Sequence, residues 1–531
     1  MRTLLLLLIY GISLAAAPPL SMTKEQRVMD FYALTRTMES SYGMLEFKKA
    51  NILQADYNQT KKQFFIDVSK ATTDEQFYKL MKKYFVVFKD GHLYIDGVYS
   101  LDKAILKVYL AWIEGKVVVL GRGQGAPASI GTGDQVLEID GKAIDQLMAE
   151  LRTYQGSGGT EAFTMRAIVD KIWIRSSNIM LPQGSSALIK LKKYSDGSVY
   201  YASVPWQVAD ASDIYSRGGS RVLDQFAGYF EGSGFWGFYP GMIESRQVRR
   251  FIDSHMLYPI ELEDSMTSEV LDVSVGSAAY KIGRIRVPDY TSWDEDIFDY
   301  HMNVVKDCDG LILDQRCNGG GAFDYCQHLV SWFLDSAIDE IEFSVPLNRF
   351  WLFYIESKLI SAGSQAQYDY LVQWRDKLFA EAAEGKKMSS WVPLFFESNT
   401  LEPREKGTFT KPVVMMIDSS CFSCGDFAPA YFKQKDMTSH FKLFGETTGG
   451  GGGNVVPYRL LPQSEMCFHM TQSIARRKDG SVIENKGVDP DIVSPYTVED
   501  MVNEMVNKQD TYMLKALTEL ISMISTKGNG D

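Results

Sequence analysis

A serine at a bend framed by small residues is the first candidate for chemistry in this chain. The segment 419–426 reads Ser-Ser-Cys-Phe-Ser-Cys-Gly-Asp, and consecutive glycines follow at 449–453. The apolar run 413–417 has the composition of a buried strand, and a helical pattern begins at 427. Ser423 would then lie at a helix N-terminus, where free N–H groups and the helix dipole favour developing negative charge. Such a position suits an acyl-transfer nucleophile, although small residues also occur at ordinary strand-to-helix turns.

A serine hydroxyl is inert unless a base accepts its proton, so partners must exist elsewhere in the chain. His92 lies in a glycine-punctuated turn, 88–95, which leads into an alternating strand, whereas His301 and His328 have the setting of ordinary helix-face residues. Glu484 lies among the turn residues of 479–491, where a carboxylate could orient an imidazole. Taken singly, a core histidine and a surface glutamate remain alternative interpretations. The remaining histidines offer no comparable setting: His255, His440 and His469.

Four segments, in order, resemble the core motifs of the C-terminal-processing and tricorn-type serine peptidases. They are 280–290, 310–321, the serine bend 419–426 and the segment 445–449. Within that group, 422–427 and 483–488 are most similar to the secreted endopeptidases of its chlamydial branch. The resemblance covers most of the chain and implies a crotonase-like α/β protease core in a multi-domain α/β protein.

The resemblance also implies a role for each candidate residue. Ser423 would be the nucleophile, His92 the general base and acid, and Glu484 the group that orients His92. C-terminal-processing members use a lysine base after their glutamate-threonine motif, but here 448–452 reads Thr-Gly-Gly-Gly-Gly. This departure favours the histidine-dependent branch, and chain order is no obstacle because triads are recognised by geometry.

The oxyanion of an acyl-transfer reaction needs hydrogen-bond donors that are already in place. We expect these to be the N–H of Cys424 and one N–H from Gly320 or Gly321. Glycine allows close approach of the backbone to a substrate, although a tight turn after the strand 311–313 would also explain it. Loss of one such donor costs about 3 kcal/mol of transition-state stabilisation.

The N-terminus has the pattern of a secretory leader. Arg2 precedes the apolar run 4–9, and small residues follow at 15–17, so residues 1–17 are expected to be a signal peptide. The run is too short to span a bilayer, and no later stretch approaches the required length. We therefore expect a secreted protein without stable membrane insertion, which the resemblance extends to onward passage into a host cell.

Composition narrows the function classes further. The 531 residues suggest two to four domains, and 45% hydrophobic with 23% charged residues is typical of globular proteins. A net charge of −12 argues against nucleic acid as a partner. Cys421 and Cys424 have no second pair at metal-ligand spacing, so we expect no metal and no cofactor. All six cysteines lie in the C-terminal half: Cys308, Cys317, Cys326, Cys421, Cys424 and Cys467.

The chain divides into segments of different pattern. Residues 23–95 show helical periodicity and carry His92, and 100–155 includes a phrase at 130–144 that resembles a PDZ domain, a module that binds extended peptides. A connecting α/β region is expected at 156–227, and the protease core at 268–531, with strands at 331–334, 341–345 and 411–417 and an amphipathic helix from 513 to 524.

The segment 228–267 is rich in glycine and aromatic residues, which suggests a loop that packs against the protein rather than a free linker. An ordinary interdomain connection is the alternative. The resemblance implies an internal inhibitory segment that a zymogen removes by cutting itself.

Together these features predict a secreted, self-processing serine endopeptidase. The resemblance implies that it acts on proteins or peptides, host-cell proteins among them, and that it forms a homodimer. The alternative is a catalytically silent relative that uses the same fold to bind peptides or other ligands.

Overall fold

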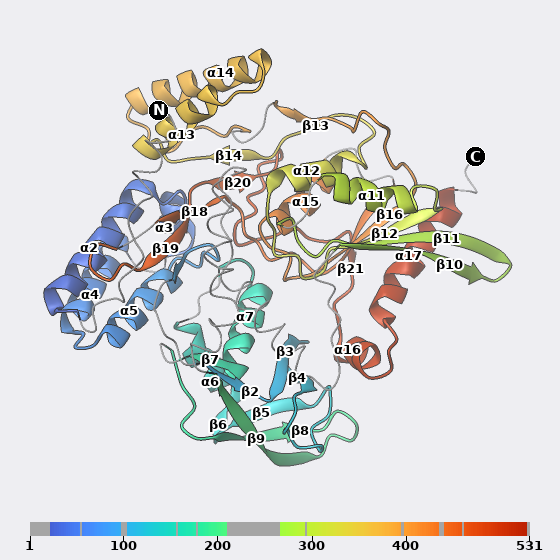
Figure 1. Ribbon diagram of the computed structural model, residues 1–531, viewed down its shortest axis with the longest axis horizontal. Coiled ribbons are helices and arrows are strands. Elements are labelled where there is room, and N and C mark those ends of the chain that lie inside the picture. The colour runs from blue at the N-terminus through green and yellow to red at the C-terminus, as the bar shows by residue number, and fades with distance from the viewer. Residues whose placement is uncertain are drawn as a thin grey trace, which may run out of the picture.

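The computed structural model describes residues 22–53, 56–96, 103–154, 158–176, 179–209, 266–291, 295–393, 398–434, 440–458 and 461–527. These residues form a mixed α/β protein with three parts: a helical N-terminal region, an antiparallel sheet, and a larger core built on a separate sheet (Figure 1). The expected signal peptide and nearly all of the expected inhibitory segment 228–267 lie outside the described residues.

The core is a largely parallel sheet with strand order β10-β11-β12-β16-β17-β21. Only the β10–β11 pair is antiparallel. Every residue of β12 and β16 is buried, as expected for parallel strands covered on both faces. The strands expected at 311–313 and 413–417 are thereby confirmed. The strand bounds are β10 Thr267–Val275, β11 Ala278–Arg286, β12 Gly310–Asp314, β16 Val413–Ile417, β17 Phe441–Gly445 and β21 Ile492–Val493.

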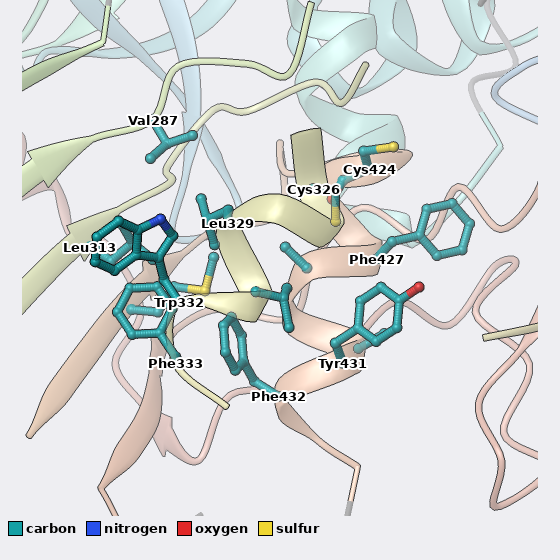
Figure 2. Close-up of a cluster of buried hydrophobic side chains, with 14 of the residues drawn as sticks. Val287, Leu313, Cys326, Leu329, Trp332, Phe333, Cys424, Phe427, Tyr431 and Phe432 are labelled. Carbon is teal, nitrogen blue, oxygen red and sulfur yellow. The ribbon is translucent and has the colours of Figure 1, made fainter. Parts of the chain in front are cut away.

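Helices cover both faces of this sheet. On one face, side chains of α12 and α15 interleave, and Figure 2 shows Phe333, just after α12, beside Phe432 of α15. On the other face, Leu520 of α17 packs in a cluster with Ile312 of β12, which confirms the expected C-terminal amphipathic helix. The helix bounds are α11 Glu295–Val305, α12 Phe323–Ser331, α15 Cys424–Phe432, α16 Val498–Met505 and α17 Thr511–Lys527.

The strand expected at 331–334 is wrong. Helix α12 ends at Ser331, and a turn follows through Phe333. Trp332, Phe333 and Leu334 are all buried in the core. A short continuous apolar run looks the same whether it is a buried strand or the buried end of a helix, so the pattern alone could not separate the two.

A second, antiparallel sheet has strand order β3-β4-β5-β8-β9-β2-β7. Strand β8 alternates exposed and buried residues, and α7 packs against β3. Because β8 pairs with β5 and β9 with β2, this sheet joins the expected segments 100–155 and 156–227. Its elements are β2 Lys103–Leu106, β3 Val108–Ile113, β4 Lys116–Arg122, β5 Gln135–Ile139, β6 Lys142–Ala143, α6 Ile144–Arg152, α7 Glu161–Trp173, β7 Ile174–Ser176, β8 Ser186–Lys192 and β9 Val199–Ala209.

The N-terminal helices are built onto strands from near the other end of the chain. Strand β1 pairs antiparallel with β19, with Tyr94 opposite His469, and the blue helices lie beside the red strands in Figure 1. Phe31 and Phe88 share a hydrophobic cluster with Phe468. The elements are α2 Lys24–Ser41, α3 Leu45–Asn51, α4 Tyr57–Lys70, α5 Asp74–Val86, β1 Tyr94–Asp96, β18 Val455–Tyr458 and β19 Cys467–Thr471.

A helical hairpin of α13 and α14 stands at the top of the molecule, above short strand pairs that frame the core (Figure 1). Among the described residues, no helix combines the length and apolar character needed to cross a bilayer. The remaining elements are β13 Ile338–Asp339, β14 Glu342–Ser344, α13 Arg349–Ile360, α14 Gln365–Ala383, β15 Thr400–Leu401 and β20 Ile474–Arg476.

Candidate active site

Ser423 occupies a strained backbone conformation between β16 and α15. Its φ of +57° and ψ of −121° fall where non-glycine residues cost about 1–3 kcal/mol, so the surrounding contacts must enforce them. The Phe422 N–H donates to the Asn318 carbonyl at 2.9 Å, and the Asp426 N–H donates to the Ser423 carbonyl at 2.7 Å. A sharp strand-to-helix turn of this kind presents a serine side chain at the end of a sheet, as in a nucleophile elbow. The expected bend is therefore present.

Gly320 lies directly against this bend. A Cβ added at Gly320 would lie 2.6 Å from the Ser423 Cβ and 2.8 Å from the Cys424 nitrogen, and its φ of +99° favours glycine. The Gly320 N–H donates to Asn318 Oδ1 at 2.8 Å. The loop 318–321 thus touches the nucleophile bend at close range, and any side chain at position 320 would displace it.

Asp426 fastens the first turn of α15 to the glycine run. This buried carboxylate accepts hydrogen bonds from the Thr448 hydroxyl at 2.5 Å and from the N–H groups of Gly450 and Gly451 at 2.7 and 2.8 Å. Burial raises the pKa of Asp426 to about 6, against the effect of these hydrogen bonds. The sequence did not predict this role for Asp426, although a carboxylate in the first turn of a helix often accepts hydrogen bonds from nearby N–H groups.

The glycine run is needed because it packs against the ring of Phe422. A Cβ at Gly451 would lie 2.4 Å from Phe422 Cζ, and one at Gly449 would lie 2.9 Å from Cδ2. The Phe163 ring stacks on Phe422 with centroids 4.3 Å apart, and the His92 ring lies 4.8 Å from it. Helix α7, the glycine run and the His92 turn therefore all pack against Phe422, the residue next to Ser423.

His92 is buried, with 3% of its surface exposed. Its backbone N–H donates to Asp90 Oδ1 at 2.9 Å, and Asp90 Oδ2 accepts from the hydroxyls of Tyr42 and Thr471. Burial lowers the pKa of His92 to about 4; Asp90 opposes this shift, and the nearby Lys48 and His469 side chains add to it. At neutral pH the imidazole is therefore uncharged, which is the form that accepts a proton.

Glu484 lies in the same buried cluster. Its Oε2 accepts from the Gly452 N–H at 3.0 Å, and its Oε1 accepts from the Lys48 ammonium at 2.5 Å. Burial raises the pKa of Glu484, Lys48 lowers it, and Asp90 raises it further. Lys48 was missed by sequence reasoning because a lysine in a short helix has the pattern of a solvated residue.

Arg166 joins the second sheet to the core beside this cluster. From α7 it donates to Asp418 Oδ2 at 3.2 Å, to the Ser420 hydroxyl at 3.0 Å and to Glu446 Oε2 at 2.8 Å. A cavity of about 500 Å³ is lined by Arg166, the β3–β4 turn and the loops after β16 and β17, including Ser419. The edge of the second sheet therefore faces the loop that leads to Ser423.

The cysteines around the bend are free thiols. The Cys424 Sγ donates to the Gly321 carbonyl at 3.0 Å, and the Cys421 Sγ donates to the Gln315 carbonyl at 3.1 Å. Burial raises the pKa of both thiols, which keeps them protonated. They pack as small apolar residues beneath the nucleophile.

Comparison with known proteins gives a consistent result. Residues 281–494 match Peptidase family S41. A protein of Chlamydia pneumoniae is 24% identical over 94% of this chain and 91% of its own length, and one of Chlamydia muridarum is 23% identical over 74% and 76%. Among solved structures, mature CPAF complexed with lactacystin has a TM-score of 0.74 at 18% identity, covering 95% of this chain and 99% of that one. Mature CPAF alone also gives 0.74, at 19% identity over 95% and 98%. This chain and mature CPAF therefore share one fold.

We expect Gly320→Ala to lower the rate at which Ser423 reacts with a fluorophosphonate by about 10²- to 10³-fold, since the new methyl group displaces the bend. Gly407→Ala is the matched control. Gly407 has nearly the same φ, +97°, but open space around its Cβ position, so it tests backbone strain alone. Equal labelling rates in both variants, measured by mass spectrometry, would contradict this account.

Proposed function

We propose that this chain, whose residues 281–494 match Peptidase family S41, is a serine-type endopeptidase with Ser423 as nucleophile, His92 as general base and Glu484 as the residue that supports His92. The observation that carries the proposal is the strained Ser423 bend, joined through Phe422 to a buried, uncharged imidazole. The contact of the His92 ring with Phe422, the residue before Ser423, supports this pairing of base and nucleophile.

The chemistry follows from these groups. His92 accepts the Ser423 proton as the hydroxyl oxygen attacks a peptide carbonyl, and the imidazolium then gives that proton to the leaving amine. Asp90 and Glu484 supply negative charge near the imidazolium while it exists. Water then attacks the acyl-enzyme by the same route and releases the second product.

The developing oxyanion is assigned to the N–H of Cys424 and one glycine N–H of the loop 318–321. The Gly320 N–H already donates to Asn318 Oδ1, which favours Gly321 over Gly320 as the second donor. Cys424 begins helix α15, so the helix dipole adds to the same stabilisation.

The finer architecture belongs to the same proposal. We assign the core as crotonase-like and the second sheet as a PDZ-like module that captures an extended peptide. The Arg166 contacts with Asp418 and Glu446 support such a role, because they hold the module beside the loop that precedes Ser423. A peptide held at that edge would be delivered toward the nucleophile.

The proposal also includes secretion, host-protein substrates, a homodimer and self-processing at 228–267. The leader-like N-terminus supports secretion, and the relative crystallised as mature CPAF supports processing. We expect purified wild-type protein to convert to two fragments on incubation and Ser423→Ala to remain one chain, as read by gel electrophoresis. If both stay intact under conditions in which peptide substrates are cut, self-processing is excluded.

The decisive test is covalent labelling together with hydrolysis. We expect a fluorophosphonate probe to modify Ser423 in the wild type, and Ser423→Ala to lose turnover of a protein substrate by roughly a millionfold. His92→Ala should lose labelling as well, because its serine has no base. Absence of labelling in a folded, processed sample would instead support a silent, ligand-binding relative.

The acid limit of activity follows from the burial of His92. Because the pKa of this imidazole is lowered to about 4, the base stays uncharged well below the ordinary histidine value of 6.5. We expect kcat/KM to rise with pH through a midpoint near 4 and to be level at neutral pH. A midpoint at 6.5 or above, measured with an uncharged peptide substrate, would show that His92 is solvated in the active enzyme.

A further inference from the structure

Lys48 is a wholly buried lysine in the short helix α3. Neither the ammonium nor the stem of its side chain is exposed. Burying an ammonium is costly unless its three donors and its charge are both satisfied. Here each donor has an acceptor: Glu484 Oε1 at 2.5 Å, Asn485 Oδ1 at 2.6 Å and the Lys89 carbonyl at 3.0 Å.

The three acceptors come from the two segments that carry the candidate base and its support. Lys89 lies three residues before His92 in the same turn, and Glu484 is followed directly by Asn485. The Asn485 amide also donates to the Lys89 carbonyl, at 2.8 Å, so the two segments meet at one oxygen. The ammonium of Lys48 therefore joins the His92 turn to the Glu484 turn.

The charges of this cluster point the same way. Asp90 and Glu484 are buried carboxylates with 1% exposure each, and Lys48 is the buried cation that bonds to one of them. Counted with both carboxylates ionised and both His92 and His469 neutral, Asp90, Glu484 and Lys48 sum to one negative charge; an imidazolium at His92 brings the sum to zero. Without Lys48, the buried carboxylates Asp90 and Glu484 would lie near each other without this cation, and one of them would take up a proton.

We propose that Lys48 is a positioning residue for the hydrolytic reaction: it holds the Glu484 carboxylate against the His92 turn and balances the buried charge around the base. This inference rests on the triad proposed above. Lys48 acts through Glu484 and His92 and contacts no reacting atom. It is a different group from the base lysine of the C-terminal-processing peptidases, whose segment here contains only Thr448 and glycines.

The test compares Lys48→Met with Lys49→Met in the full-length, processed enzyme. Lys49 is the adjacent lysine, partly exposed, paired with Glu46 and placed over the Tyr57 ring, so its loss should change neither rate nor pH profile. For Lys48→Met we expect kcat/KM to fall about 100-fold, the cost of a misplaced catalytic group. The titratable groups that act on His92 are Asp90, Lys48 and His469; the Lys48 charge lowers the pKa of His92, so the acid limb should move to higher pH without it.

A double-mutant cycle keeps the proposal testable if Lys48→Met does not fold. The variant Lys48→Met/Glu484→Gln leaves neither charge of the pair behind, so it avoids an unpaired buried ion. If Lys48 acts through Glu484, this double variant should match Glu484→Gln in kcat/KM within about threefold. A further loss of about 100-fold in the double variant, as for independent sites, would overturn the role.

The outcomes separate this inference from the proposed function. If the wild type neither hydrolyses substrate nor reacts with a fluorophosphonate, the triad fails and the role of Lys48 falls with it. If the wild type is active and folded Lys48→Met keeps its rate and its acid limb, only the inference about Lys48 fails, and Lys48 is a structural residue. An active wild type with a shifted limb in Lys48→Met, and no shift in Lys49→Met, supports the assignment.

Discussion

The ring of Phe422 is the contact on which the site depends. It lies next to Ser423 in the chain and is covered by Phe163, the His92 ring, Gly449 and Gly451. Three separate parts of the protein therefore meet on one side chain, and each is placed relative to the nucleophile by packing. This packing requires glycine at position 451, because an added Cβ there would overlap the Phe422 ring.

Buried charge imposes a second constraint. The region around His92 contains carboxylates that could not stay ionised in an apolar interior without partners, and each has them: Asp90 accepts two hydroxyls and a backbone N–H, and Glu484 accepts an ammonium and a backbone N–H. Asp426 is satisfied in the same way, because it accepts hydrogen bonds from Thr448 and from the glycine run. The polar groups that position the candidate base and the candidate nucleophile also satisfy the hydrogen bonding of the interior.

Local pattern explains which features could be predicted from sequence. The strand before Ser423, the bend and the C-terminal helix were predictable because each depends on neighbouring residues. The end of α12 was mistaken for a strand because its three apolar residues, Trp332, Phe333 and Leu334, are too few to show a period. Lys48 was invisible, since its partner Glu484 lies 436 positions away and nothing near position 48 marks it as buried. Likewise, the joining of 100–155 to 156–227 depends on long-range pairing between β5 and β8.

The pairing of β1 with β19 has a consequence for the life of the chain. Tyr94 emerges early from the ribosome, but its strand partner His469 is made only near the end of synthesis. Contacts of such long sequence separation form late, because the intervening chain must first be ordered. The His92 imidazole therefore reaches its place against Phe422 only after almost the whole polypeptide exists. A growing chain of this protein therefore lacks the assembled candidate site until synthesis is nearly complete.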